Sequence, residues 1–175
     1  MLNPIKFLAL AGYALYTLAA TPVMAAPVDE FALPTITGIE KRQDIRVVYD
    51  VKDDTHEAGI GKALYYVRGL LESYHSLGVA PDQLHISIVM HGPTAYWLLN
   101  DASYREFKHD PFAVNPNDQV VEELLAHGVS VEICHLTMKG KGWTADDLLP
   151  GVTMVHDAYT RLIDLQQRGY AYIRF

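Results

Sequence analysis

Cys134 is the side chain of this sequence best suited to nucleophilic chemistry, because it is the single cysteine and ends an alternating apolar segment. The alternation predicts a β-strand over 129–134, with Glu132 and Cys134 on the same face. At the end of a strand, backbone N–H groups of the next loop could stabilise a thiolate, the reactive form of the side chain. The alternative is a buried structural cysteine, which is common for this residue type, and a carboxylate such as that of Glu132 disfavours a thiolate beside it.

Two histidines are expected at the same edge of the fold as Cys134. His135 follows Cys134 directly, and His91 follows the apolar segment 84–90. Either imidazole could accept the thiol proton or share a metal ion with the sulfur; the alternative for each is a polar loop residue. A Cys/His metal set can be drawn with His156, but its spacing matches no compact zinc pattern. We therefore expect no metal and no cofactor.

Other candidate motifs indicate local structure. The basic, glycine-rich segment 139–142 could hold an oxyanion such as sulfate, but it lacks the full phosphate-binding pattern and is expected to be a flexible loop. The Asp-Asp-Thr segment 53–55 has the side chains that begin a helix. The sequence contains no Gly-x-Ser-x-Gly motif, no paired catalytic carboxylates and no dinucleotide fingerprint.

The composition is that of one globular domain. The chain has 175 residues, of which 50% are apolar and 20% charged, so intrinsic disorder is excluded. A single cysteine allows no intrachain disulfide and no multi-cysteine metal site. With 21 acidic against 14 basic residues, the formal net charge is −7, which argues against nucleic acid as a partner.

Residues 1–25 are expected to form a secretory signal peptide. Lys6 precedes the apolar run Phe7–Ala20, which has the length of a signal-peptide core and is short for a membrane span. Pro22 follows, and Val23-Met24-Ala25 offers compact residues to a signal peptidase. An uncleaved anchor is the alternative. We therefore expect an exported protein, in a bacterial periplasm, with no stable membrane span after cleavage.

The rest of the chain alternates strands and helices after an N-terminal arm over 26–43. Strands are expected at 45–51, 84–90, 129–134, 152–155 and 170–175, with helices at about 53–77, 95–99, 116–127, 143–149 and 158–168. The segment 100–118 is expected to be a loop or broken helix that could cover a site. Such alternation implies a mainly parallel sheet covered by helices. Sites in such sheets lie beyond the carboxyl ends of the strands, which groups segments 50–55, 91–93 and 134–138 at one edge.

A family resemblance rests on four segments of the sequence. They are His91-Gly92-Pro93 after a strand, Gly128-Val129-x-Val131-x-x-Cys134-x-x-Thr137-Met138 after Leu124, Asp147-Leu148-Leu149-Pro150-Gly151-Val152, and Leu165-Gln166-x-x-Gly169-Tyr170-Ala171-Tyr172. In these residues the chain resembles the DsrE/DsrF-like family of sulfur-relay proteins, in an exported branch, over residues 44–175.

The resemblance implies a fold, an assembly and a role. The fold is a three-layer α/β/α sandwich with a mainly parallel sheet of about five strands, assembled as a homotrimer or hexamer. The role is sulfur handling: a cysteine at the end of this strand can carry a persulfide, and Cys134 matches it by position. The implied partners are sulfur donor and acceptor proteins or small sulfur compounds. In an oxidising compartment, however, a lone thiolate is open to oxidation.

Three hypotheses follow. The first is a sulfur carrier in which Cys134 holds the sulfur and His135 or His91 acts as base or orienting group. It requires a sulfur atom that is exposed at the edge of the sandwich and held anionic by nearby donors. The second is a non-catalytic oligomeric envelope protein that binds a small anion, a metal or a protein, with Cys134 merely packed. The third is a copper or zinc binder that uses Cys134, His135 and His91.

Overall fold

The structure is a computed structural model that describes residues 36–175. The expected signal peptide over 1–25 lies outside the described residues, as does most of the expected arm over 26–43. Within the described part, no helix combines the length and the hydropathy needed to span a bilayer.

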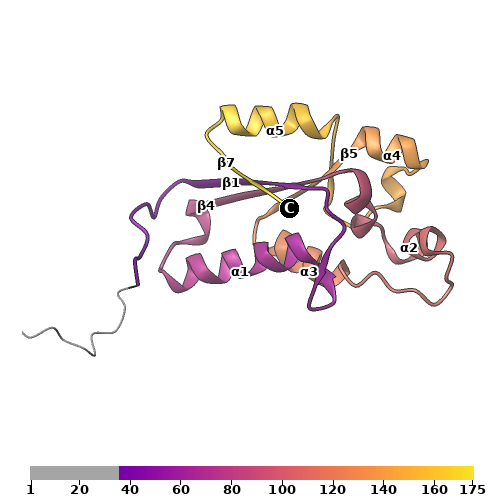
Figure 1. Ribbon diagram of the computed structural model, residues 1–175, viewed down its shortest axis with the longest axis horizontal. Helices are drawn as coiled ribbons and strands as arrows, with labels where there is room; N and C mark the ends of the chain where they lie inside the picture. The colour runs from indigo at the N-terminus through magenta and orange to yellow at the C-terminus, as the bar shows by residue number, and fades with distance from the viewer. Residues whose placement is uncertain (1–35) are drawn as a thin grey trace, which may run out of the picture. The chain divides into compact units, whose positions relative to one another are not determined.

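A five-stranded sheet with the strand order β6-β5-β4-β1-β7 forms the middle layer (Figure 1). The strands are β1 (Ile45–Val51), β4 (Leu84–Met90), β5 (Ser130–Cys134), β6 (Thr153–Val155) and β7 (Ala171–Arg174). Every neighbouring pair is parallel, so each connection must cross from one end of the sheet to the other. The expected parallel sheet is thus confirmed.

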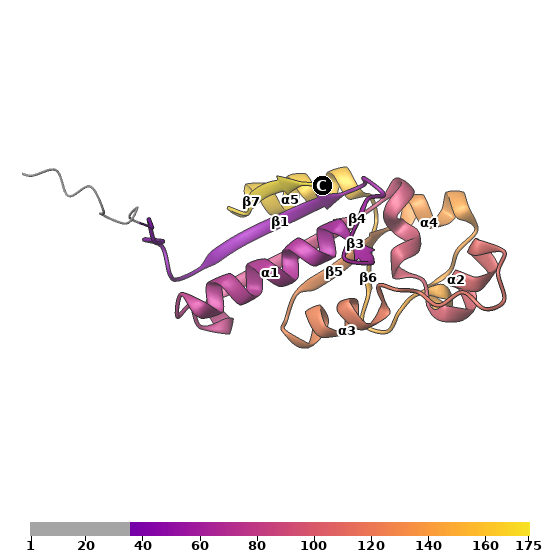
Figure 2. The ribbon, with the colours of Figure 1, turned by 60° about the horizontal axis from the view of Figure 1, so that its bottom comes forward.

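Helices cover both faces of this sheet. The α-helices are α1 (Lys62–Ser76), α2 (Asp101–Lys108), α3 (Asp118–Ala126), α4 (His135–Lys141) and α5 (Ala158–Gln167). Short 3₁₀ helices are η1 (Pro81–Gln83), η2 (Gly92–Leu98) and η3 (Ala145–Asp147). α1 and α3 lie on one face and α5 on the other (Figures 1 and 2). This is the expected α/β/α sandwich.

The alternation of β5 divides its side chains between two apolar clusters. Val131 and Ile133 belong to the larger cluster, which packs under α1 and α3. Cys134 belongs to the smaller one, on the α5 face. The buried members of this smaller cluster are Val48, Val89, Cys134, Ala158, Leu162 and Leu165. The face assignment made from the sequence is therefore confirmed.

The expected helix start at 53–55 is wrong, because a β-hairpin intervenes. β2 (His56–Glu57) and β3 (Ile60–Gly61) pair antiparallel, and α1 begins after Gly61. Ala58 (φ 49°) and Gly59 (φ 86°) form the connecting turn, and two positive φ values match the right-handed twist of a tight hairpin. The hairpin was missed because strands of two residues carry no apolar period.

Two further expectations are corrected. The segment 139–141 is not a loop but the last turn of α4, which ends at Gly142 in the left-handed region (φ 75°). Lysines there interact favourably with the helix dipole. The segment 100–118 contains a regular helix, α2, whose first turn is capped by the Asn100 side chain accepting from Ser103 N at 3.0 Å.

Smaller shifts affect two helix starts. The helix expected over 95–99 is instead η2, which begins at Gly92 and contains Thr94, whose hydroxyl donates to Val51 O at 2.8 Å. Pro116 is not the first residue of α3, which begins at Asp118.

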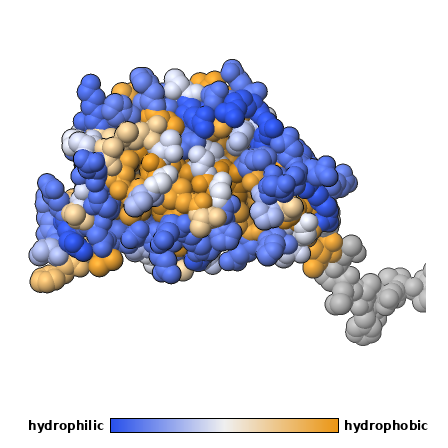
Figure 3. All heavy atoms as spheres, turned by 180° about the vertical axis from the view of Figure 1, so that it is seen from behind, coloured by the Kyte–Doolittle hydropathy of each residue, from blue (hydrophilic) through white to orange (hydrophobic). Residues whose placement is uncertain are grey.

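The surface seen from behind has an apolar area in its middle that hydrophilic residues surround (Figure 3).

Candidate functional site

Cys134 is the last residue of β5 and directly precedes α4. It is 4% exposed, and α5 covers it with Ala158 and Leu162. Within residues 36–175, its sulfur makes no hydrogen bond. The expectation of an exposed sulfur atom is therefore wrong for this structure. β6 pairs with β5, and α5, which follows β6, covers the end of β5 where Cys134 lies. Val48 and Val89 of the same cluster are 0% exposed, so Cys134 lies nearer its rim.

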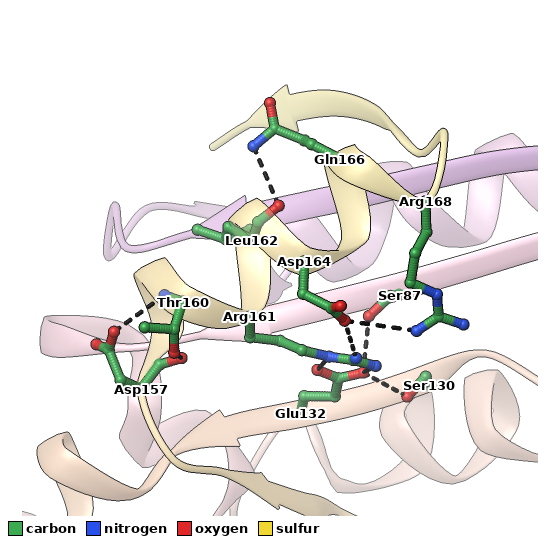
Figure 4. A network of polar contacts seen from close by, with 10 residues as sticks. All are labelled: Ser87, Ser130, Glu132, Asp157, Thr160, Arg161, Leu162, Asp164, Gln166 and Arg168. Carbon is green, nitrogen blue, oxygen red and sulfur yellow. Dashed lines mark hydrogen bonds and ion pairs between the residues drawn. The ribbon is translucent and has the colours of Figure 1, made fainter.

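Glu132, two residues before Cys134, does not carry an uncompensated charge. It is 1% exposed and accepts two bonds from Arg161 of α5, with Nε–Oε2 at 2.7 Å and Nη2–Oε1 at 2.8 Å (Figure 4). The hydroxyls of Ser87 and Ser130 also donate to Oε1, at 2.9 and 2.8 Å. The carboxylate also raises the pKa of Arg161 by this hydrogen bonding. Arg161 therefore balances the negative charge of Glu132, which on its own would disfavour a thiolate at Cys134.

Arg161 was missed by sequence reasoning, although a signal existed. A carboxylate in the middle of an apolar strand must meet a cation or hydrogen-bond donors when it is buried. The covering helix had to supply that cation, and Arg161 lies beside Leu162 on the buried side of α5.

His91 lies at the end of β4 in a second buried polar group. It is 7% exposed, and its Nε2 is 2.7 Å from Oδ1 of Asp50, which is 3% exposed. The Tyr172 hydroxyl of β7 donates to the other oxygen of Asp50 at 2.5 Å. Burial, and then the hydrogen bond to Asp50, raise the pKa of Tyr172 to about 12. The ring of His91 also meets Tyr159 of α5 edge-on, with ring centroids 5.4 Å apart.

The register of the sheet brings His91 and Cys134 to neighbouring positions. Met90 of β4 pairs with Ile133 of β5, so the next residue of each strand is His91 and Cys134. Both backbones are extended there, and adjacent strands lie about 4.8 Å apart. Contacts with α5 place both side chains on the same face. The structure thus places two of the three predicted site residues at the ends of adjacent strands, on the same face of the sheet.

His135 does not join them. It is the first residue of α4 and is exposed, as is His156 before α5. No group of three His, Cys, Asp or Glu side chains with a metal-binding arrangement occurs among residues 36–175.

A pocket of about 260 Å³ opens beside the Asp50–His91 pair, between α5 and the β1–β7 edge of the sheet. Asp50, Tyr159 and Tyr172 line it together with two cationic side chains, Lys52 and Arg174. Sequence reasoning placed Asp50 at this edge but gave it no role.

Asp54 forms a separate polar group at the same edge of the sheet. Its carboxylate accepts from the Tyr96 hydroxyl at 2.8 Å and from Nε1 of Trp97 at 3.0 Å. Burial, and then the bond to Asp54, raise the pKa of Tyr96 to about 12. Asp54, which the sequence suggested as a helix cap, instead ties the loop after β1 to η2.

Two solved structures and one family model are similar to this chain. The chain is 26% identical to MTH1491 from Methanobacterium thermoautotrophicum, a protein of unknown function, over 75% of this chain and 100% of that one, with a TM-score of 0.57. It is 16% identical to the ychN protein from E. coli over 76% of this chain and 99% of that one, with a TM-score of 0.49. No curated protein sequence matches. The model of the DsrE/DsrF-like family matches residues 47–175, and the chain therefore belongs to the DsrE/DsrF-like family.

Proposed function

We propose that this protein is a sulfur carrier in which Cys134 holds a persulfide. The observation that carries the proposal is the placement of Cys134 beside His91, a histidine already bonded to Asp50, at the carboxyl edge of the sheet. Membership of the DsrE/DsrF-like family supports it. His91 is the proposed base rather than His135, because His135 points away into solvent as an exposed residue of α4.

The chemistry is a thiol–persulfide exchange. The Cys134 thiolate attacks the outer sulfur of a donor persulfide; a new S–S bond forms at Cys134 while the S–S bond of the donor breaks. The donor leaves as a thiolate and takes up the proton that Cys134 gave up. Nothing is oxidised or reduced overall, so no co-reactant is needed. Transfer to an acceptor thiol is the same step in reverse.

Burial restricts which donors can react. Cys134 is 4% exposed under the start of α5, so transfer requires α5 to open over the sulfur, and a small donor needs a smaller opening than a folded protein does. Burial also protects a stored persulfide from bulk oxidants, which is useful in an oxidising compartment. We propose export to the periplasm on the pattern of residues 1–25, and assembly into a trimer or hexamer as expected for the family.

Intact-mass measurement tests the carrier role. Purified protein is incubated with glutathione persulfide, thiosulfate or polysulfide. We expect the mass of one added sulfur on the wild-type chain and none on Cys134→Ser. The matched control is Ser130→Cys in the Cys134→Ser background, which moves the thiol to the other end of the same strand face. Absence of an adduct with all three donors would reject the proposal, as would an equal adduct on the control.

A second candidate is the non-catalytic envelope protein that binds a partner. The burial of Cys134 without a hydrogen bond favours it, and so does the apolar area of Figure 3, since such areas mark interaction surfaces. Thiol labelling separates the two candidates. A thiol that stays unlabelled until the protein unfolds supports the second, and a thiol that reacts in the folded protein supports the first.

A further inference from the structure

The strongest unassigned feature is the buried hydrogen-bonded chain Tyr172–Asp50–His91. Its members come from three different segments, β7, β1 and the end of β4, which the sheet order places side by side. Asp50 is 3% and His91 7% exposed, so both groups had to lose most of their hydration to lie there. Buried polar networks of this kind fix the orientation of their members.

We infer that Asp50 and Tyr172 are positioning residues that orient His91 to accept the proton of Cys134. The inference deepens the proposed function and rests on it. His91 would be the group that contacts the reacting sulfur, whereas Asp50 acts through His91 and Tyr172 acts through Asp50.

The directions of the hydrogen bonds indicate which nitrogen of His91 is free to accept a proton. An ionised carboxylate only accepts, so Nε2 of His91 must carry a proton to bond with Asp50. The Tyr172 hydroxyl supplies the donor for the second oxygen of Asp50. In neutral imidazole, Nδ1 is then the nitrogen without a proton, and it makes no hydrogen bond within residues 36–175. Nδ1 is therefore left as the acceptor for a neighbour.

The pairing of β4 with β5 makes Cys134 the neighbour of His91. Cys134 follows Ile133, the partner of Met90, and both side chains face α5. The proton of the thiol passes to Nδ1, the thiolate attacks the donor persulfide, and the imidazolium returns the proton to the leaving thiolate. Asp50 stabilises the imidazolium in the interval.

Other groups surround His91 from each packed element. The Tyr159 ring of α5 contacts His91, Cys134 of β5 follows the register partner of Met90, and Glu132 on the same face of β5 is paired with Arg161. Lys52, after β1, and Arg174 of β7 line the pocket beside Asp50. The positive charges of Lys52 and Arg174 in this pocket would attract an anionic donor such as a persulfide or thiosulfate.

The test measures the rate of Cys134 alkylation by iodoacetamide against pH, together with persulfide loading from glutathione persulfide. The variants are His91→Gln, Asp50→Asn and Tyr172→Phe. The controls are His85→Gln, an exposed histidine at the other end of β4, and Tyr66→Phe on α1. We expect His91→Gln to slow alkylation at pH 7 on the order of 100-fold, as loss of a general base does. Tyr172→Phe removes one hydrogen bond and is expected to slow it about fivefold.

Nitrogen NMR of the histidine rings gives a readout that does not depend on reactivity. We expect neutral His91 of the wild type to carry its proton on Nε2. In Asp50→Asn, whose amide can donate, we expect a shift towards the Nδ1-protonated form. A wild-type ring protonated on Nδ1 would overturn the inference even if Asp50→Asn does not fold.

The outcomes separate the inference from the proposed function. If the persulfide forms on Cys134 but all pH profiles coincide, the positioning role is wrong and the carrier stands. If the profiles differ as expected but no persulfide forms from any donor, the carrier is wrong while His91 still governs the thiol. If the folded thiol reacts with neither reagent, both are wrong.

Discussion

Arg161 and Glu132 join α5 to the sheet through two parallel hydrogen bonds of 2.7 and 2.8 Å. Bidentate contacts of this kind fix geometry as well as energy. Since α5 also covers Cys134, this ion pair holds in place the helix that closes the candidate site (Figure 4).

Arg161→Ala is expected to lower the free energy of unfolding by about 3–5 kcal/mol, because it leaves Glu132 buried without a cation. Urea unfolding measures the loss. The matched control is Arg168→Ala, an exposed arginine at the C-terminal end of α5 whose partner Asp164 is 3.5 Å away; it should change stability by less than about 0.5 kcal/mol. Equal losses in the two variants would contradict a special role for the ion pair.

Gly61→Ala is expected to destabilise the fold by about 1–3 kcal/mol, because its new Cβ would overlap the ring of Trp97 in a fully packed core. Gly69→Ala is the control: it lies within α1 with no atom within 4 Å of the new Cβ. Alanine is the better helix former there by about 0.5–1 kcal/mol. Thermal unfolding should therefore move the two Tm values in opposite directions, and a shift of both in one direction would refute this explanation.

Asp54→Ala is expected to cost about 1–3 kcal/mol, because the donors of Tyr96 and Trp97 lose their shared acceptor. Asp54→Asn keeps an acceptor oxygen and should recover part of the loss. Asp53→Ala, at the neighbouring exposed position, is the control. The near-ultraviolet dichroism and fluorescence of Trp97 report the change. An Asp53 variant as unstable as Asp54→Ala would show that the loop, not the hydrogen bonds, is at fault.

Asp147→Asn is expected to make stability less dependent on pH in acid. The hydroxyl of Ser103, and then the amide of Thr144, lower the pKa of Asp147 in the folded chain. A lowered folded pKa means that the stabilisation is complete above the unfolded value of about 3.9 and is lost as pH falls through the folded value.

At pH 7 the Asn variant should therefore be less stable by about 0.5–1 kcal/mol, because its neutral amide oxygen accepts more weakly than the carboxylate from Ser103 and Thr144. The difference should begin to shrink below about pH 4 and should close as the pH falls through the lowered pKa of Asp147. Asp146→Asn, the adjacent exposed acid, serves as control. Urea midpoints measured from pH 3 to 7 decide the matter: a difference that persists unchanged at pH 3 would rule out the carboxylate as its source.

The strands were predictable because parallel strands are buried on both faces and appear as continuous apolar runs. β1 and β4 match such runs residue for residue, as do the helix ends at Gly78 and Gly128, whose positive φ only glycine adopts readily. The β2–β3 hairpin and α4 were not predictable, since the hairpin packs against α1 and Trp97, and α4 packs against β5 and η2, rather than following a local period.

The candidate site was predictable only in part. Cys134 and His91 end apolar strands, and that alone places them at one edge. Tyr172 could not be connected with Asp50, because nothing in the sequence says that β7 lies beside β1 rather than beside β6. The coverage of Cys134 by α5 also depends on the order of the strands, which the sequence does not reveal.

The hydrogen bond between Asp50 and Tyr172 spans 122 positions of the sequence. During synthesis, the acid of β1 leaves the ribosome long before its tyrosine partner exists. Until β7 pairs with β1, the Asp50 carboxylate lacks the Tyr172 donor, so water must hydrate its second oxygen. Assembly of the histidine group would then be a late event of folding, and a chain stalled before β7 would lack it.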